Sequence, residues 1–199
     1  MTTGRGRDGA QTNMNQLPLR ERVANERRRL KSVREALSAA LANGAHGDAS
    51  FVPFYVAVAD YVEASMHRLH IQDVRMGEMI RAKLGPPDAS AQKAMGELDE
   101  RLAGNQRHLS NLLESRDALK KRGVAALNHF EQVGRDYTNY IVTSMGHHGG
   151  TTDLAQKLFS VDDWAYMAGI TEEETRREQV LHDQVFKSVP KSLKLPAPS

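Results

Sequence analysis

The longest uninterrupted helical pattern in the chain, residues 51–84, constrains the fold more than any other stretch. Its apolar residues recur at steps of three and four, which is the spacing of one buried stripe along an α-helix. They are Phe51, Tyr55, Val58, Val62, Met66, Leu69, Met76 and Ile80. A helix of this length buries its stripe against other helices, so the stretch predicts an all-α fold.

Three further stretches repeat this spacing: residues 17–43, 90–122 and 124–145. Gly44 ends the first of them, Gly85-Pro86-Pro87 ends the pattern of residues 51–84, and Gly123 breaks the chain before the last. Connections this short make consecutive helices antiparallel neighbours. We therefore predict an antiparallel up-down four-helix bundle over residues 17–148, with additional short C-terminal helices over residues 149–187 packing on it.

The two ends of the chain have a different character. Residues 1–16 lack any periodicity and predict a disordered arm, whereas residues 188–199 are proline-rich and basic and predict a flexible tail. Before the tail, two pairs spaced as capping boxes predict the starts of short helices: Ser160 with Asp163, and Thr171 with Glu174.

Composition excludes several classes of protein. The 199 residues suit one domain, and the absence of cysteine excludes disulfides, thiolate nucleophiles and cysteine metal sites. No apolar run reaches the roughly 20 residues that cross a bilayer, so we expect a soluble, cytoplasmic protein without a membrane partner. The formal charge of +2 gives no argument for nucleic acid, which we consider an unlikely partner.

Four side chains of metal-ligand type lie on or beside the stripe of residues 51–84: Glu63, His67, His70 and Asp73. Their spacings of three and four residues place neighbouring pairs on one helix face. Imidazole and carboxylate together suit iron, manganese or zinc, and helical bundles build such sites between facing helices. The alternative is a set of solvated positions, in which Glu63 and His67 form an ordinary surface pair.

Glu26 interrupts the apolar face of the first predicted helix. Either it pairs with Arg22 or Arg29 at the surface, or it turns inward and binds a cation. Counting from the first turn at about 1.5 Å per residue places Glu26 level with His67 and His70. That agreement in level is the best argument from the residues alone for a site between the two helices.

The same count places His147 and His148, at the end of the fourth predicted helix, near Asp73. Either one of these histidines completes the metal site, or both only interact favourably with the dipole at the end of their own helix. The predicted metal ligands are therefore His70, Asp73, Glu26, His147, His148, Glu63 and His67.

The segment NERRRL in the first predicted helix and the segment LHIQD in the second resemble a divergent hemerythrin-like, or HHE cation-binding, domain over residues 17–148. The resemblance implies a four-helix bundle that holds non-haem iron, as a di-iron or single-iron site. It implies ligands among Glu26, His70 and Asp73 and one histidine of the pair that ends the fourth helix. Leu69 and Leu112 stand where that family carries histidines, so the motif is incomplete.

Two classes of function follow. The resemblance implies sensing of oxygen, nitric oxide or redox state, or metal handling, with iron as the cofactor and manganese or zinc as the other candidates. The second class is a metal-free helical interaction or scaffold protein, which acts through a homodimer or through a protein partner. Whether the chain is an enzyme stays open, although no phosphate-binding loop, G-x-S-x-G elbow or H-E-x-x-H motif is present.

Overall fold

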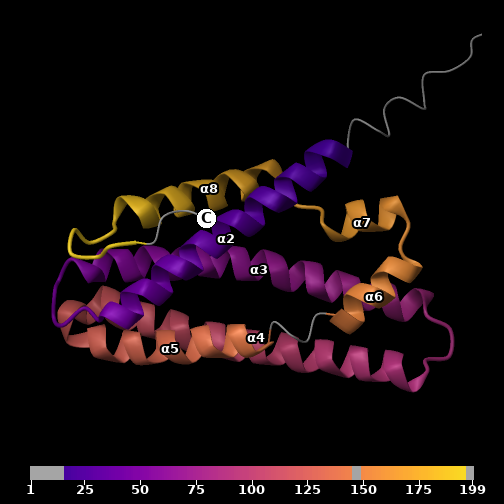
Figure 1. The fold of residues 1–199 in the computed structure, drawn as a ribbon, viewed down its shortest axis with the longest axis horizontal. Coiled ribbons are helices and arrows are strands. Elements are labelled where there is room, and N and C mark those ends of the chain that lie inside the picture. The colour runs from indigo at the N-terminus through magenta and orange to yellow at the C-terminus, as the bar shows by residue number, and fades with distance from the viewer. Residues whose placement is uncertain (1–15, 145–148, 196–199) are drawn as a thin grey trace, which may run out of the picture.

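The computed structural model describes residues 16–144 and 149–195, and within them every regular element is helical (Figure 1). The first part of the chain forms α2 (Gln16–Asn43), α3 (Phe51–Lys83), α4 (Ala89–Arg122), the 3-10 turn η1 (Gly123–Ala126) and α5 (Leu127–Ser144). The second part forms α6 (Gly149–Leu158), α7 (Val161–Met167) and α8 (Glu172–Lys187). The predicted all-α class is confirmed.

Helices α3 and α4 form a long hairpin that runs along the length of the helical part in Figure 1, and the other helices pack on it. Its turn contains Pro86 and Pro87, which cannot continue a helical hydrogen-bond ladder. Asp88 then caps α4, since its side chain accepts a hydrogen bond from the Ala91 N–H at 2.8 Å. The helix boundaries predicted around this turn agree with the structure to within about two residues.

The main core lies where α2 and α5 pack beside the N-terminal half of α3. Its largest apolar side chains are aromatic and almost completely buried: Phe51, Phe54, Tyr55, Tyr61 and Phe130. Gly134 of α5 faces Leu41 of α2, and a Cβ at position 134 would lie 3.2 Å from Leu41 Cδ2. The glycine therefore brings α2 and α5 close together, as a small residue in a helix contact does.

A second, smaller core lies at the other end of the hairpin, beneath α6 and α7. Met76 and Ile80 of α3 pack there with Met95 and Leu98 of α4. The aromatic rings of Phe159 and Trp164 lie over this group, with their centroids 5.4 Å apart. Trp164 therefore packs on the hairpin of α3 and α4 at this end.

Helix α8 packs along α3 and α2, on the opposite side of α3 from α5 (Figure 1). Both predicted capping boxes are present, at Ser160 with Asp163 for α7 and at Thr171 with Glu174 for α8. The described part of the predicted flexible tail, residues 188–195, packs on the main core, where Leu193 is buried. That segment is thus attached more closely than its composition predicts.

One difference from the sequence-based expectations concerns a helix end: the fourth helix begins only after η1, at Leu127. A Cβ at Gly150 would lie 2.9 Å from the Ala94 Cβ, so this glycine serves the packing of α6 on α4. The predicted antiparallel up-down arrangement of four helices is more specific than the helical packing described here, and it stays a prediction.

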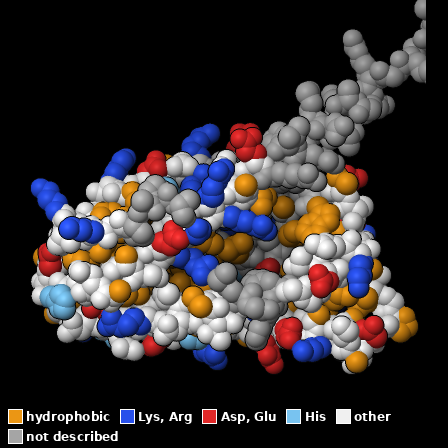
Figure 2. All heavy atoms as spheres, in the orientation of Figure 1, with side chains coloured by type: hydrophobic (Ala, Val, Ile, Leu, Met, Phe, Trp, Pro, Cys, Tyr) orange, Lys and Arg blue, Asp and Glu red, His pale blue; other side chains and the backbone are white. Residues whose placement is uncertain are grey.

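The surface carries charges of both signs. On the face drawn in Figure 2, basic and acidic side chains lie side by side rather than in one basic area. This face therefore lacks the continuous basic surface with which proteins bind nucleic acid. Across residues 16–144 and 149–195, no helix combines the length and apolar character needed to span a bilayer.

Candidate functional site

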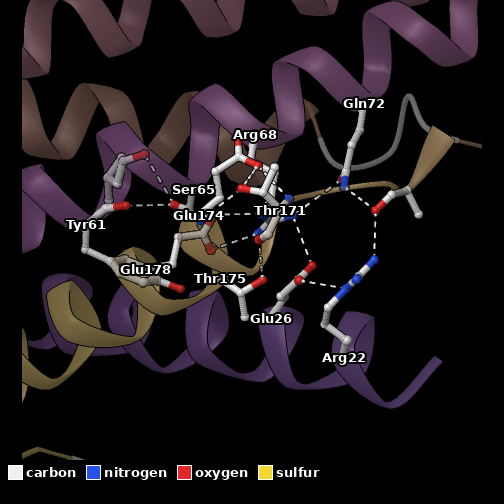
Figure 3. A network of polar contacts seen from close by, with 12 residues as sticks. Arg22, Glu26, Tyr61, Ser65, Arg68, Gln72, Thr171, Glu174, Thr175 and Glu178 are labelled. Carbon is white, nitrogen blue, oxygen red and sulfur yellow. Dashed lines mark hydrogen bonds and ion pairs between the residues drawn. The ribbon is translucent and has the colours of Figure 1, made fainter. Parts of the chain in front are cut away.

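Glu26 lies in the interior, at the level that residue counting from the first turn predicts, but its partner there is an arginine. Arg68 of α3 places its Nη1 atom 3.3 Å from Glu26 Oε2, and its Nε and Nη2 atoms donate to Glu178 of α8 at 2.6 and 3.2 Å (Figure 3). All three side chains are at most 8 % exposed. We call Glu26, Arg68 and Glu178 the buried ion triad; it joins α2, α3 and α8.

The charge balance of this triad depends on a fourth residue. Two carboxylates face one buried guanidinium, and Arg22, with its Nε atom 3.6 Å from Glu26 Oε1, supplies the second positive charge. Burial raises the pKa of Glu26, and the Glu178 carboxylate acts in the same direction, whereas Arg68 and Arg22 oppose the shift. Glu26 Oε1 accepts no hydrogen bond from the described residues. The triad is therefore an ion-pair cluster that depends strongly on Arg68.

The other two carboxylates that the sequence singled out are also paired with arginines. Asp73 lies 3.2 Å from Nη2 of the buried Arg101 on α4. Glu63 lies 2.5 Å from Nη1 of Arg116, which also binds Asp60 at 2.9 Å. The surface pair of Glu63 with His67 is thus replaced by an ion pair between α3 and α4.

The histidines of the predicted site are placed differently from one another. His67 is exposed and His70 is half-buried, and both line one cleft on the surface of α3. His147 and His148 lie outside the described residues, so their predicted approach to Asp73 stays a prediction.

A metal centre needs several ligands around one point, and the described residues do not provide one. Within residues 16–144 and 149–195, no group of three or more histidine, aspartate or glutamate side chains is arranged to hold a metal ion. Glu26, Glu63 and Asp73 already neutralise guanidinium groups. A carboxylate bound to arginine would have to leave it before it could bind iron. The described residues therefore do not fit a di-iron centre.

The cleft that contains His67 and His70 has a volume of about 480 Å³ and lies between α3, α4 and α8. Met66 and Leu109 give it apolar walls, and Arg177 and Glu174 stand on its α8 side. Asn105 of α4 also lines it, and the Asn105 Oδ1 atom is buried without a hydrogen-bond partner. Because a buried unpaired oxygen is unfavourable, a ligand's donor that reached this atom would be stabilised.

Helix α8 forms one wall of this cleft, and polar contacts hold it in place. Arg29 Nη1 donates to Gln179 Oε1 at 2.7 Å, and Ser32 Oγ lies 3.2 Å from His182 Nε2. The His182 ring packs against the rings of Tyr61 and Phe186, with centroids 5.9 and 4.9 Å away. His182 is thus a half-buried residue in the contact of α8 with α2 and α3.

Acidification is expected to loosen α8 through His182. Burial lowers the pKa of His182 below its usual 6.5, and Arg29 acts in the same direction, while the adjacent Asp183 opposes the shift. A histidine with a depressed pKa stabilises the fold while it is neutral. This contribution is present above pH 6.5 and is lost as the pH falls through the depressed pKa. Hydrogen exchange of the α8 amides, corrected for intrinsic rates, measures the loosening between about pH 7.5 and about pH 5.5.

The matched control for this measurement is His182→Gln, which keeps a polar side chain and removes the titration. Its α8 amides should show much less change over the same range of pH. An identical change in both proteins would contradict the assignment to His182.

Sequence reasoning missed four residues that organise this site, Arg68, Glu178, Arg101 and Arg177, and it predicted Glu174 only as a helix-capping residue. Arg68 stands within the helical pattern of residues 51–84, and an arginine beside an apolar stripe was a usable signal for an inward charge. Glu178 carried no such signal, because α8 is short and polar on most of its surface.

Comparisons with known proteins add no relative. No protein-family model matches the chain, and no curated protein and no solved structure matches it closely enough to show a relationship. The hemerythrin-like resemblance therefore stays a prediction, and the proposals below depend on the geometry of the described residues.

Proposed function

We propose that this chain is a metal-free helical interaction protein whose binding site is the cleft between α3, α4 and α8. The observation that carries the proposal is that some polar groups of the cleft are paired within the protein and others are not. Of the carboxylates that line the cleft, Glu63 and Glu178 are paired with arginines, and Glu174 is held in the capping box of α8. Asn105 Oδ1 is buried without a partner, and His70 has no polar contact among the described residues. The cleft thus offers hydrogen-bonding groups rather than a metal-binding cluster.

The size of the cleft suits a binding role. A volume of about 480 Å³ lies within the range of roughly 300–1,000 Å³ that ligand sites commonly have. The lining is more polar than is usual for such sites, with four apolar residues and nine polar or charged ones. In this proposal, helices α2 to α5 form an antiparallel up-down bundle, and the protein works in the cytoplasm.

Metal binding of the hemerythrin-like kind is the second candidate function. The observation that favours it is that His67 and His70 line the same cleft, three residues apart on α3. Oxygen, nitric oxide or redox sensing by iron would require further ligands, for which His147 and His148 are the candidates.

Site-specific photo-cross-linking tests the interaction function. A photoreactive phenylalanine at Gln106, an exposed position on the α4 side of the cleft, should capture a defined partner in cells. The same residue at Gln132, exposed on α5, is the matched control and should not capture it. Ala64→Trp fills the cleft and should abolish capture while the helical circular dichroism is retained. Equal capture at both positions, or capture that Ala64→Trp leaves unchanged, would overturn the proposal.

A further inference from the structure

Helix α8 has its own start and end signals. The Thr171 N–H donates to Glu174 Oε2 at 2.7 Å, and the Glu174 N–H donates to Thr171 Oγ1 at 3.1 Å, which closes a capping box. Three acidic residues occupy the first turn and Lys187 lies in the last, in the favourable orientation relative to the helix dipole. These features stabilise the helix whether or not it is docked.

The docked face of α8 combines polar and apolar contacts. Of its 16 residues, Glu178 and Val185 are buried, and Leu181 packs partly buried on the main core. Glu178 binds Arg68, and two further hydrogen bonds reach Arg29 and Ser32 of α2. When such a face separates, its charged groups regain the hydration that they lost on burial. This rehydration offsets part of the cost of undocking α8.

The connection before α8 is short and is held by side chains of α2 and α3. Four residues, 168–171, join α7 to α8. Within them, the Ala168 carbonyl accepts a hydrogen bond from Arg22 at 3.2 Å, and the Gly169 carbonyl accepts one from Arg75 at 3.0 Å. Short connections of this kind allow a terminal element to exchange between two copies of a chain.

We propose that α8, with the segment that follows it, exchanges between two copies of this chain. In the exchanged dimer the second copy's α8 lies on α2 and α3 and completes the buried ion triad. Every contact of α8 is then formed again, including the burial of Val185 and Leu193 in the main core. A second copy is the best-matched occupant, because its α8 carries the carboxylate and amide that Arg68 and Arg29 bind.

The exchange has a consequence for the cleft. Glu174, Arg177 and Glu178 line its α8 side, so in the dimer these three groups come from the second copy. The site is then composite and is incomplete in a chain whose α8 has swung away. The proposal uses the cleft of the proposed function, but it is measured without any ligand, so either can fail while the other holds.

The absence of cysteine from the chain makes the exchange directly measurable. Ser32 Oγ and His182 Nε2 lie 3.2 Å apart across the contact of α2 with α8. One full-length chain carries Ser32→Cys and a second carries His182→Cys. The two are mixed at high concentration and treated with a short bismaleimide. A covalent heterodimer forms at these positions only when α8 of one chain docks on α2 of the other.

Control pairs separate exchange from random collision. Ser38→Cys and Asn139→Cys are exposed on α2 and α5, outside the α8 contact, and report collisions alone. We expect the heterodimer yield of the Ser32 and His182 pair to exceed this control by about tenfold and to rise with protein concentration. Adding Glu178→Ala to the His182→Cys chain should reduce the yield toward the control.

The contrary result is a heterodimer yield no greater than that of the control pair. A single chain that carries both Ser32→Cys and His182→Cys should then cross-link only internally. That result would overturn the exchange and establish α8 as a purely intramolecular helix. If either cysteine variant loses its helical circular dichroism, Arg29→Cys and Gln179→Cys, which replace residues joined at 2.7 Å, provide the same test.

Discussion

Arg68→Met is expected to lower the free energy of unfolding by about 3–5 kcal/mol, because it leaves two buried carboxylates without their guanidinium partner. Arg68 donates two hydrogen bonds to Glu178 and forms an ion pair with Glu26, and all three side chains are almost completely buried. Methionine retains much of the arginine stem but none of its donors. Urea unfolding followed by circular dichroism measures the loss.

Two comparisons make this result specific. Arg81→Met removes an exposed pair with Asp99, whose side chains are 48 % and 60 % exposed, and should cost less than about 1 kcal/mol. Adding Glu26→Leu and Glu178→Leu to Arg68→Met removes the whole triad, and most of the stability should return. A cost for Arg68→Met no larger than that for Arg81→Met would show that the triad does not hold α2, α3 and α8 together.

Glu131→Ala is expected to destabilise the protein by about 2–5 kcal/mol, because two buried donors lose their acceptor. Glu131 Oε1 accepts hydrogen bonds from the Ala45 N–H at 2.6 Å and from the Tyr55 hydroxyl at 2.9 Å. The carboxylate of α5 thereby fixes the turn between α2 and α3. Thermal and urea unfolding should both show the loss.

Glu131→Gln is the matched control, since its amide oxygen can still accept both hydrogen bonds. Its cost should be less than half that of the alanine variant. If glutamine and alanine cost the same, the two hydrogen bonds are not the source of the stability.

The features that sequence predicts well here are local ones. The stripe of residues 51–84, the proline turn and both capping boxes depend on residues close together in the chain, and all are present. The level of Glu26 opposite residues 67–70 also follows from helix length and turn position alone. Arg68, in the middle of that level, indeed meets Glu26.

The identity of the inward side chain was harder to predict than its level. Successive residues of a helix differ by about 100° in direction, so a small rotation of α3 decides whether Arg68 or a neighbouring histidine faces α2. On the inward side Arg68 binds Glu178 of α8, which lies 110 residues further along the chain. No local pattern encodes this pairing.

Glycine gave a second ambiguous signal. Gly44 follows the end of α2, whereas Gly150 lies within α6 against Ala94. Glycine both ends helices and permits close helix contacts, and the sequence around it does not distinguish these uses.

Elemental analysis tests most directly whether Glu26, Glu63 and Asp73 bind arginines or a metal. Untagged protein is purified without chelator, loaded with ferrous iron under anaerobic conditions and measured beside a His70→Ala variant. We predict that both proteins contain iron, manganese and zinc far below one ion per chain. Stoichiometric metal in the unmodified protein that is lost in His70→Ala would contradict a metal-free interaction site and support the hemerythrin-like function.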